Sequence, residues 1–440
     1  MIGPTTLARD RLMGSRGVTA FQHRNYRLFF SGQLISLIGT WMQQVAQAWL
    51  VLQLTGDPIW LGIVATAQFL PVMVFGLFAG VAADAFPKRR VLLGTQLSMM
   101  ILAVILAVLV ITNLVQVWMI VVLAFLLGIA NAVDMPVRQS FAVELVGRED
   151  VGPAVALNSA MFNGARVVGP AAAGLAIGAF GVAAAFVLNA VSFLAVLVGL
   201  WLMDEKELKI GARIARPASA RAVVQNLAEG LRYVRQTRIV LLAVVVVGSV
   251  ATVGMNFNVL IPAFAQHELR SDATGFGFLM AASGLGSLLA ALRLAFGGRP
   301  QPIRLVSGSV ILGVASVALA ASRAFPLSLG LMVVIGFGSI LMAATANTAI
   351  QMAVPDHLRG RVMSLYTTVF SASMPIGGLA MGAVASGFGA SAAIALGGVL
   401  SVGVGLAALA WGRRQGFGLP ETTSVGIGAG LAGVSTARLR

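Results

Sequence analysis

Long uncharged hydrophobic runs, separated by short polar breaks, follow one another along this chain from Tyr26 to Trp411. Crossing about 30 Å of hydrocarbon takes about 20 helical residues, because each residue advances an α-helix by about 1.5 Å. Inside hydrocarbon the backbone must satisfy its own hydrogen bonds. Runs of this length without strict polar and apolar alternation therefore favour helices over a barrel, and the chain is expected to cross a membrane repeatedly.

The hydrophobic pattern predicts twelve spans and an all-α membrane protein. Only 10% of the residues are charged while 58% are hydrophobic, which leaves no room for a separate soluble domain. The predicted spans cover residues 26–52, 59–83, 91–112, 117–137, 154–180, 183–203, 239–261, 275–296, 304–322, 327–350, 363–387 and 391–411.

The second half of the chain repeats the first. A shift of 208 positions pairs glycines at equivalent places: Gly128 with Gly336, Gly169 with Gly377, and Gly174 with Gly382. The first two spans of each half need a shift nearer 215, which pairs Gly62 with Gly277. A parallel repeat of six spans predicts two six-helix bundles related by a pseudo-twofold axis along the membrane normal. A binding site is expected between them near mid-membrane.

The basic residues fall on one side of this arrangement. The net charge of +15 would favour nucleic acid in a soluble chain. With the N-terminus in the cytoplasm, however, the tails and even-numbered turns hold all the Lys and Arg except Arg166, Arg270 and Arg323. That distribution follows the positive-inside rule, so both termini are expected in the cytoplasm. Anionic lipid at the cytoplasmic face is an expected partner, and nucleic acid is not.

The polar breaks divide the chain into five predicted parts: a cytoplasmic tail (1–25), a first bundle (26–203), a cytoplasmic linker (204–238), a second bundle (239–411) and a tail expected to be disordered (412–440). In the linker, Val223, Leu227, Leu231 and Val234 share one helical face. This pattern predicts an amphipathic helix packed on the membrane surface, with a regulatory partner site as the alternative.

Several chemistries are not expected from the composition. The chain has no cysteine, and its three histidines, His23, His267 and His357, are widely separated, so no metal site or cofactor is predicted. It has no Gly-x-x-x-x-Gly-Lys-Ser/Thr sequence that would bind ATP. No acid pair, nucleophile with its base, or metal cluster falls inside the spans, so the chain is not expected to be an enzyme.

A charged turn follows the second span. Gly80 permits close helix approach, Asp84 can sit at the positive end of a neighbouring helix, and Arg89 can reach an acid on span four. Asp134 is predicted to be that acid. Gly80-x-x-x-Asp84-x-x-x-Lys88-Arg89 resembles the loop signature of the major facilitator superfamily, although Ala85 and Pro87 replace a usual base and a usual glycine.

Other stretches resemble one branch of that superfamily, which contains the enterobactin exporter and other secretion carriers. They are Phe21-x-His-Arg-Asn-Tyr-Arg-Leu-Phe, Asp134-x-Pro-x-Arg138-Gln139 and Glu229-Gly-Leu-Arg-Tyr-Val-Arg235. The resemblance implies alternating access. It also implies a latch against span eleven that closes the cytoplasmic side when the carrier opens outward, formed by Gly80, Asp84, Lys88, Arg89, Asp134 and Arg138. Anchoring of the turn alone is the alternative role of these charges.

Arg166 is the only base near the middle of a span, about 18 Å from the predicted start of span five. A charge in that position is costly and marks a functional site, and an arginine there suits a carboxylate, phenolate or phosphate. Asn163 shares its helical face. Both residues are predicted to contact substrate, while pairing of Arg166 with carbonyl groups or with Asp134 is the alternative.

Uncharged polar residues form a stripe on span one. Thr40, Gln43 and Gln47 lie on one face, which predicts the wall of a wet cavity, with interhelical hydrogen bonding as the alternative. Asn256 in span seven is expected to face the same cavity from the other half.

Gly169-Pro170-x-x-x-Gly174 in span five resembles a signature associated with drug and proton antiporters. Glycine and proline at these positions allow close helix contact and a bend, so a packing role is also expected.

Together these features predict a secondary active transporter in a bacterial-type cytoplasmic membrane, functional as a monomer. It would export a small drug-like or siderophore-like molecule by alternating access. Proton antiport is implied by the family resemblance, with Asp134 the best candidate carrier and Arg166 a weaker one. An importer with the same fold, or a non-transporting receptor or scaffold, are the alternatives.

Overall fold

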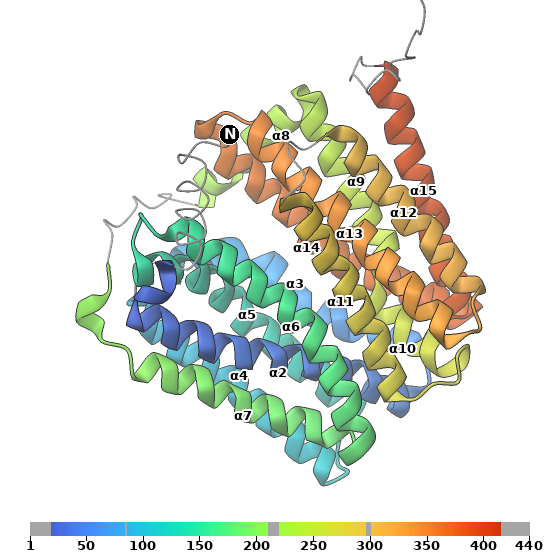
Figure 1. Ribbon diagram of the computed structural model, residues 1–440, viewed down its shortest axis with the longest axis horizontal. Coiled ribbons are helices and arrows are strands. Elements are labelled where there is room, and N and C mark those ends of the chain that lie inside the picture. Colours follow the sequence, from blue (N-terminus) through green and yellow to red (C-terminus); the bar gives the residue numbers. More distant parts are fainter. Residues whose placement is uncertain (1–18, 84–85, 210–219, 296–300, 415–440) are drawn as a thin grey trace, which may run out of the picture.

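The computed structural model describes residues 19–83, 86–209, 220–295 and 301–414, which form helices joined by short turns (Figure 1). Asp84 of the charged turn and most of the predicted C-terminal tail lie outside the described residues. Gly80 lies within a described helix, but its surroundings are not described.

The first half contains six long helices after the short helix η1 (Thr19–Gln22). They are α2 (Arg24–Thr55), α3 (Pro58–Ala83), α4 (Lys88–Ile111), α5 (Val117–Val146), α6 (Val151–Phe180) and α7 (Val182–Trp201). The turn η2 (Glu205–Glu207) follows α7. Within this half α2 packs on α6 and α7, α3 on α5, and α4 on α5 and α7.

The second half begins after α8 (Ala220–Gln236), the helix of the linker. It contains α9 (Arg238–Gly254), α10 (Phe257–His267), α11 (Ala273–Ala295), α12 (Pro302–Ala321), α13 (Phe325–Ala353), α14 (Asp356–Phe388) and α15 (Ala390–Arg414). α8 packs on α14 and α9, where Glu229 pairs with Arg361 and the side chain of Val234 is buried.

Ten segments among the described residues are long and apolar enough to cross a membrane, α9 and α10 counting as one. The two long helices outside this set are α2 and α6, of 32 and 30 residues. They carry the predicted polar stripe and Arg166, which lower their mean hydropathy, yet both pack inside the first bundle. The predicted all-α fold of twelve spans in two six-helix bundles is confirmed.

Two predicted spans differ from the helices in the structure. Span four was expected to end at residue 137, but α5 continues through Pro136 to Val146 because Phe141 and Leu145 are buried in the core of the first bundle. Span seven was expected to be one helix ending at residue 261. It breaks between Gly254 and Phe257 and continues as α10 to His267.

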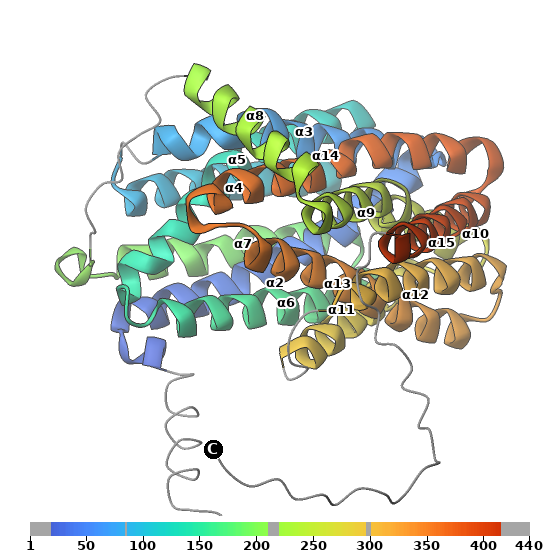
Figure 2. The ribbon, with the colours of Figure 1, turned by 90° about the horizontal axis from the view of Figure 1, so that it is seen from above.

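Equivalent glycines of the repeat make equivalent contacts between the halves. Gly174 of α6 packs against Gly277 of α11, and Gly382 of α14 packs against Gly62 of α3. Gly174 and Gly382 are 208 positions apart, and Gly62 and Gly277 are 215 apart. These are the two shifts of the sequence repeat, so the two contacts are equivalent to each other. Figure 2 shows α6 beside α11 and α3 beside α14.

The same correspondence holds inside each bundle. Gly128 of α5 packs against the backbone of Gln68 in α3, and Gly336 of α13 packs against the backbone of Ser283 in α11. These residues are again 208 and 215 positions apart. The repeat in the sequence is therefore a repeat of helix contacts.

The halves meet at one end of the molecule. We call the end at which α7 stops and α9 begins the linker end, and the opposite end the far end. Contacts between the halves include two hydrogen bonds to backbone carbonyls and one ring stack: Thr66 to Pro375 at 3.0 Å, Thr274 to Gly174 at 3.2 Å, and Trp49 on Phe276 at 6.1 Å between centroids. All six residues lie in the far-end halves of their helices. From there the bundles diverge toward the linker end (Figure 1).

Helix η1 is tied to the start of α6 at the linker end. Thr19 Oγ1 donates a hydrogen bond to Asp150 Oδ1 at 2.7 Å, and His23 Nε2 lies 2.9 Å from Asp150 Oδ2. The hydrogen bond with His23 lowers the pKa of the Asp150 carboxyl most, and the hydrogen bond with Thr19 lowers it further.

Replacing Gly277 should weaken the junction of the halves. A Cβ atom there would lie 2.5 Å from the carbonyl oxygen of Pro170 and 2.8 Å from Cα of Gly174. Gly277→Ala is expected to lower the free energy of unfolding by about 1–3 kcal/mol, measured through the thermal unfolding midpoint. Gly94→Ala is the control, because no atom outside its own helix lies within 4 Å of that position. Equal midpoints for the two variants would contradict this contact.

The Asp150 contacts predict a pH dependence of stability. The carboxyl has a lower pKa in the folded protein, so its contribution is present above the unfolded pKa of about 3.9 and is lost as the pH falls through the folded value. Asp150→Asn should therefore lower the melting temperature at pH 7, and the difference from wild type should shrink as the pH falls below the unfolded pKa of about 3.9. Glu149→Gln, at an exposed neighbouring position, is the control. A difference in melting temperature that does not change as the pH is lowered would refute the assignment.

Candidate translocation site

The surroundings of α6 change at Arg166. Toward the far end α6 packs on α11, and Gly284 of α11 contacts the backbone of Arg166. Val155, Phe162 and Arg166 follow at spacings of seven and four residues and so share one face of the helix. Toward the linker end this face is open, because the side chains of Val155 and Phe162 are 55% and 47% exposed. Arg166 therefore lies beside a contact between the halves and at the end of an exposed face of α6.

An aromatic side chain holds the guanidinium of Arg166 from one side. Its Cζ atom lies 5.9 Å from the ring centroid of Trp41 in α2, a cation–π contact. Phe162 meets the same indole edge to face, with centroids 5.8 Å apart. Gly169 makes room for this arrangement, since Cβ of Trp41 occupies the space that a side chain at Gly169 would need. Stacking fixes the cation and leaves its N–H donors available.

Arg166 has no carboxylate partner among the described residues. The ion pairs found there join other side chains, and Asp134 pairs with Arg138 instead. The alternative interpretation of an Arg166 to Asp134 pair is therefore wrong. A half-buried cation inside a spanning helix without a carboxylate is a site that an anion from outside the protein would stabilise.

The second half presents no matching charge. The repeat places Met374 of α14 at the position of Arg166, and Phe370 at that of Phe162. Both second-half side chains are half-buried. A molecule between the bundles would thus meet a cation on one wall and largely apolar side chains on the other.

The polar stripe of α2 is more enclosed than expected. The side chains of Gln43 and Gln47 are each 7% exposed. Asn189 of α7 donates a hydrogen bond to Gln43 Oε1 at 2.5 Å, so interhelical hydrogen bonding, the alternative interpretation, describes Gln43. Thr40 is half-buried and donates to the carbonyl of Ser36 at 2.9 Å. The reason is that α2 packs between α6 and α7, which covers much of this stripe.

The two predicted asparagines differ in position. Asn163 is half-buried on the open part of α6, one turn from Arg166, and donates to the carbonyl of Ser159 at 2.8 Å. Asn256 lies in the break between α9 and α10, where it is 4% exposed and donates to the carbonyl of Thr252 at 2.6 Å. The structure brings Asn163 together with Arg166 and encloses Asn256 in the second bundle.

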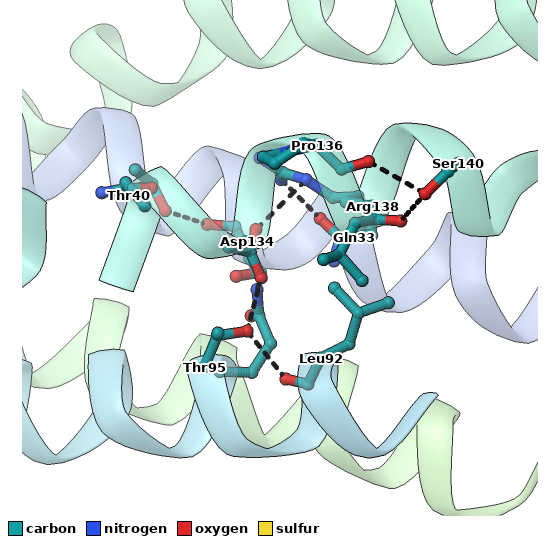
Figure 3. A network of polar contacts seen from close by, with 12 residues as sticks. Gln33, Thr40, Leu92, Thr95, Asp134, Pro136, Arg138 and Ser140 are labelled. Atoms are coloured by element: carbon teal, nitrogen blue, oxygen red, sulfur yellow. Dashed lines mark hydrogen bonds and ion pairs between the residues drawn. The ribbon is translucent and has the colours of Figure 1, made fainter. Parts of the chain in front are cut away.

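Asp134 is the centre of a buried polar network between α2, α4 and α5 (Figure 3). Its Oδ1 atom accepts hydrogen bonds from Thr95 Oγ1 at 2.8 Å and from Gln96 Nε2 at 2.9 Å. Its Oδ2 atom lies 3.3 Å from Nε of Arg138, whose Nη1 donates to Gln33 Oε1 at 3.0 Å. The carboxylate is 1% exposed, so its charge depends on these partners.

The network is incompletely bonded. Asp134 Oδ2 has an ion-pair distance to Arg138 without hydrogen-bond geometry, and Gln33 Nε2 and Gln96 Oε1 are buried without partners. A proton on Asp134 Oδ2 would therefore not displace an existing hydrogen bond. The sequence had pointed to Asp134 but not to its partners, although Gln33 extends the polar stripe of α2 by one more turn.

The pairing predicted for the charged turn is wrong. Arg89 does not reach Asp134. It pairs with Glu205 and donates to the carbonyls of Leu200 and Trp201 at the end of α7. Lys88 makes the contact with the fourth span, at 2.8 Å from Glu144. The reason is that α5 extends nine residues beyond its predicted end at residue 137. The added residues include Glu144, which lies beside the turn.

The glycine and proline signature of α6 lies at helix contacts. Gly169 packs against Trp41 of α2, and Pro170 and Gly174 pack against Gly277 of α11. One edge of this short segment thus supports the stacked tryptophan, and the other joins the two halves.

Two six-helix bundles that meet at one end, with a cation beside a contact between them, define a membrane transporter. The sequence matches the transmembrane secretion effector family over residues 15–424. The chain belongs to that family, within the major facilitator superfamily, and is not an enzyme.

Individual relatives agree with this assignment. The chain is 31% identical to the multidrug efflux pump Tap of Mycolicibacterium fortuitum over 355 residues, which cover 78% of this chain and 85% of that protein. It is 26% identical to the staphyloferrin A transporter of Staphylococcus aureus over 375 residues, covering 82% and 90%. The crystal structure of the POT family transporter PepTSo has a similar fold, with a TM-score of 0.72 and 14% identity over 89% of this chain and 98% of that one.

Proposed function

We propose that this protein exports a small organic anion across the cytoplasmic membrane by alternating access, driven by proton antiport. The observation that carries the proposal is Arg166, stacked on Trp41 and without a carboxylate partner in the described structure, beside a contact between the halves and at the end of an exposed face of α6. Bound there, an anion would neutralise the cation.

The orientation follows from charge. Most exposed bases near helix ends, including Arg24, Arg90 and Arg414, lie at the linker end, whereas Arg270 and Arg323 lie at the far end. The positive-inside rule favours the cytoplasm for the end with the excess of bases. Both termini are then cytoplasmic. In this proposed orientation the space between the halves would open to the cytoplasm, which is the state in which an exporter loads its substrate.

The walls of the site indicate the kind of molecule. Arg166 would contact an anionic group, while Trp41, Phe162, Phe370 and Met374 offer surface to an apolar or aromatic part. Among the relatives are proteins described as a multidrug efflux pump, a macrolide efflux protein and a staphyloferrin A transporter. These descriptions support export of a drug-like or siderophore-like compound by this chain.

The charged turn is proposed to act as a latch in the opposite state. In this structure Lys88 and Arg89 pair with acids of their own half. When the linker end closes, α14 must approach this turn, and Gly80, Asp84 and these bases would then form the closed contact. Asp134 and Arg138 support the turn from α5.

Asp134 is the proposed proton carrier. It is the one carboxylate buried inside a described spanning helix away from a helix end, and its Oδ2 atom can take a proton without losing a hydrogen bond. Protonation would release Arg138 from its ion pair and so change the contact with Gln33 of α2.

Transport tests the substrate role of Arg166. A stabilisation screen of siderophores, drugs and amphipathic anions against the purified protein supplies the probe, whose uptake into inverted vesicles is measured under an imposed proton gradient. Arg166→Gln is expected to reduce uptake at least tenfold, because a hydrogen bond to a charged group contributes about 1.5–3 kcal/mol. Arg232→Gln, on the exposed face of α8, should transport normally.

Uptake by right-side-out vesicles instead of inverted ones would identify an importer, and no flux in either would leave a receptor or scaffold. Normal uptake by the Arg166→Gln protein would remove this residue from the substrate site.

Substitution of Asp134 tests coupling. Asp134→Asn cannot release a proton, so it should abolish gradient-driven uptake while substrate exchange across vesicles without a gradient continues. Glu144→Gln, which removes the carboxylate beside Lys88, is the control and should retain coupling. Gradient-driven uptake by the Asp134→Asn protein would exclude Asp134 as the carrier.

A further inference from the structure

A lateral groove lies on the second bundle. An open hollow of about 630 Å³ is lined by residues of α9, α14 and α15. All three helices belong to the second half, and α15 packs against α9, α12 and α14 of that half. Its lining includes side chains that are largely exposed: Val245 at 51%, Ile376 at 59% and Leu400 at 41%.

The wall of the groove is apolar. Thr252 donates its hydroxyl hydrogen bond to the carbonyl of Gly248 at 2.7 Å, and Ser373 donates to the carbonyl of Val369 at 2.9 Å. Both polar side chains are thereby satisfied within the bundle. Of the lining residues only Ser249 keeps a hydroxyl that is not committed to a described carbonyl.

The groove has the depth of one lipid leaflet. Along α9 it extends from Val244 to Val253, about 14 Å at the rise of an α-helix. Half of the hydrocarbon core of a bilayer is about 15 Å thick. A single extended acyl chain therefore matches this hollow in length and in polarity.

Two bases lie between the groove and the linker end. Arg238 precedes Val245 by seven residues on the same face of α9, about 10 Å nearer the linker end. Arg414 of α15 lies ten residues beyond Val404, about 15 Å, and within a quarter turn of the groove face. Both are exposed. Trp411, seven residues beyond Val404, lies on that face at the depth where tryptophans meet lipid headgroups.

We propose that this groove binds an anionic phospholipid of the cytoplasmic leaflet. One acyl chain fills the cavity between α9, α14 and α15, and the phosphate contacts Arg238 and Arg414. An acyl chain covers the apolar wall, while the negative headgroup pairs with bases that have no other partner in the described structure. The three helices belong to one bundle, so the lipid stays bound while the halves rock.

Retention of lipid tests the proposal. The full chain is reconstituted in nanodiscs of equal phosphatidylglycerol and phosphatidylcholine, released into detergent and weighed by native mass spectrometry. Wild type should retain phosphatidylglycerol at least fivefold over phosphatidylcholine. The R238Q/R414Q double variant should lose this preference, and Val245→Phe, which fills the groove, should lose the bound lipid.

Control variants outside the groove test whether lipid retention depends on the groove or on any exposed base or apolar side chain. R24Q/R90Q removes two exposed bases of the first half, and Val399→Phe enlarges a side chain that is 58% exposed on α15 outside the groove. Both should retain lipid as wild type does. Equal loss in the control variants, retention by Val245→Phe, or a second copy of the chain in place of the lipid would overturn the proposal.

Labelling of the unmodified protein makes the test independent of variant folding. Phosphatidylglycerol with a photoreactive diazirine in its acyl chain is expected to label peptides of α9, α14 and α15 at least fivefold more than those of α4 and α7. Uniform labelling of all lipid-facing helices would show that the groove holds no particular lipid.

Discussion

The close approach of α6 to α11 and of α3 to α14 at the far end determines where this protein can open. A Cβ atom on Gly277 of α11 would lie 2.5 Å from the carbonyl oxygen of Pro170, and one on Gly62 of α3 would lie 2.3 Å from that of Gly378, so no side chain fits at either joint. Lipid tails are as apolar as the helices, so such small-residue contacts supply packing that a hydrophobic effect cannot provide between spans. With the halves joined there, the space between them can widen only toward the linker end, and the repeat makes the two joints equivalent.

The position of Arg166 follows from this constraint. Its backbone touches Gly284 of α11, while its side chain shares a helical face with the exposed side chains of Val155 and Phe162. The contact with Trp41 lies wholly within the first bundle, so it does not depend on how the two halves are placed relative to each other. The contact with Gly284 crosses between the halves and would be lost in the proposed state that opens at the far end.

The fold was largely predictable because its signals are local and repeated. The hydrophobic runs predicted the positions of the spans. The glycines that recur after 208 or 215 positions predicted the two bundles. The errors concern partners. Arg89 was predicted to pair with Asp134 because the hydrophobic run of span four ends near residue 137. In the structure α5 continues past Glu144, because Phe141 and Leu145 are buried in the core. Gln43 was assigned to a cavity wall because periodicity identifies a face but not the helix that covers it, here α7. Trp41 was missed because stacking on Arg166 depends on the relative rotation of two helices.

The site is chemically one-sided, and that asymmetry bears on how substrate would move the halves. A ligand shifts a conformational equilibrium only by as much as its affinity differs between the states. In the proposed alternating-access cycle Arg166 and Trp41 would move together, because both lie in the first bundle, so their contribution to binding would be similar in both states and could not by itself favour closure. The difference would have to come from the second half, where Phe370 and Met374 of α14 would approach or leave the ligand. A purely anionic ligand held by Arg166 alone would bind without promoting transport, whereas one with an apolar part spanning both walls would couple binding to movement.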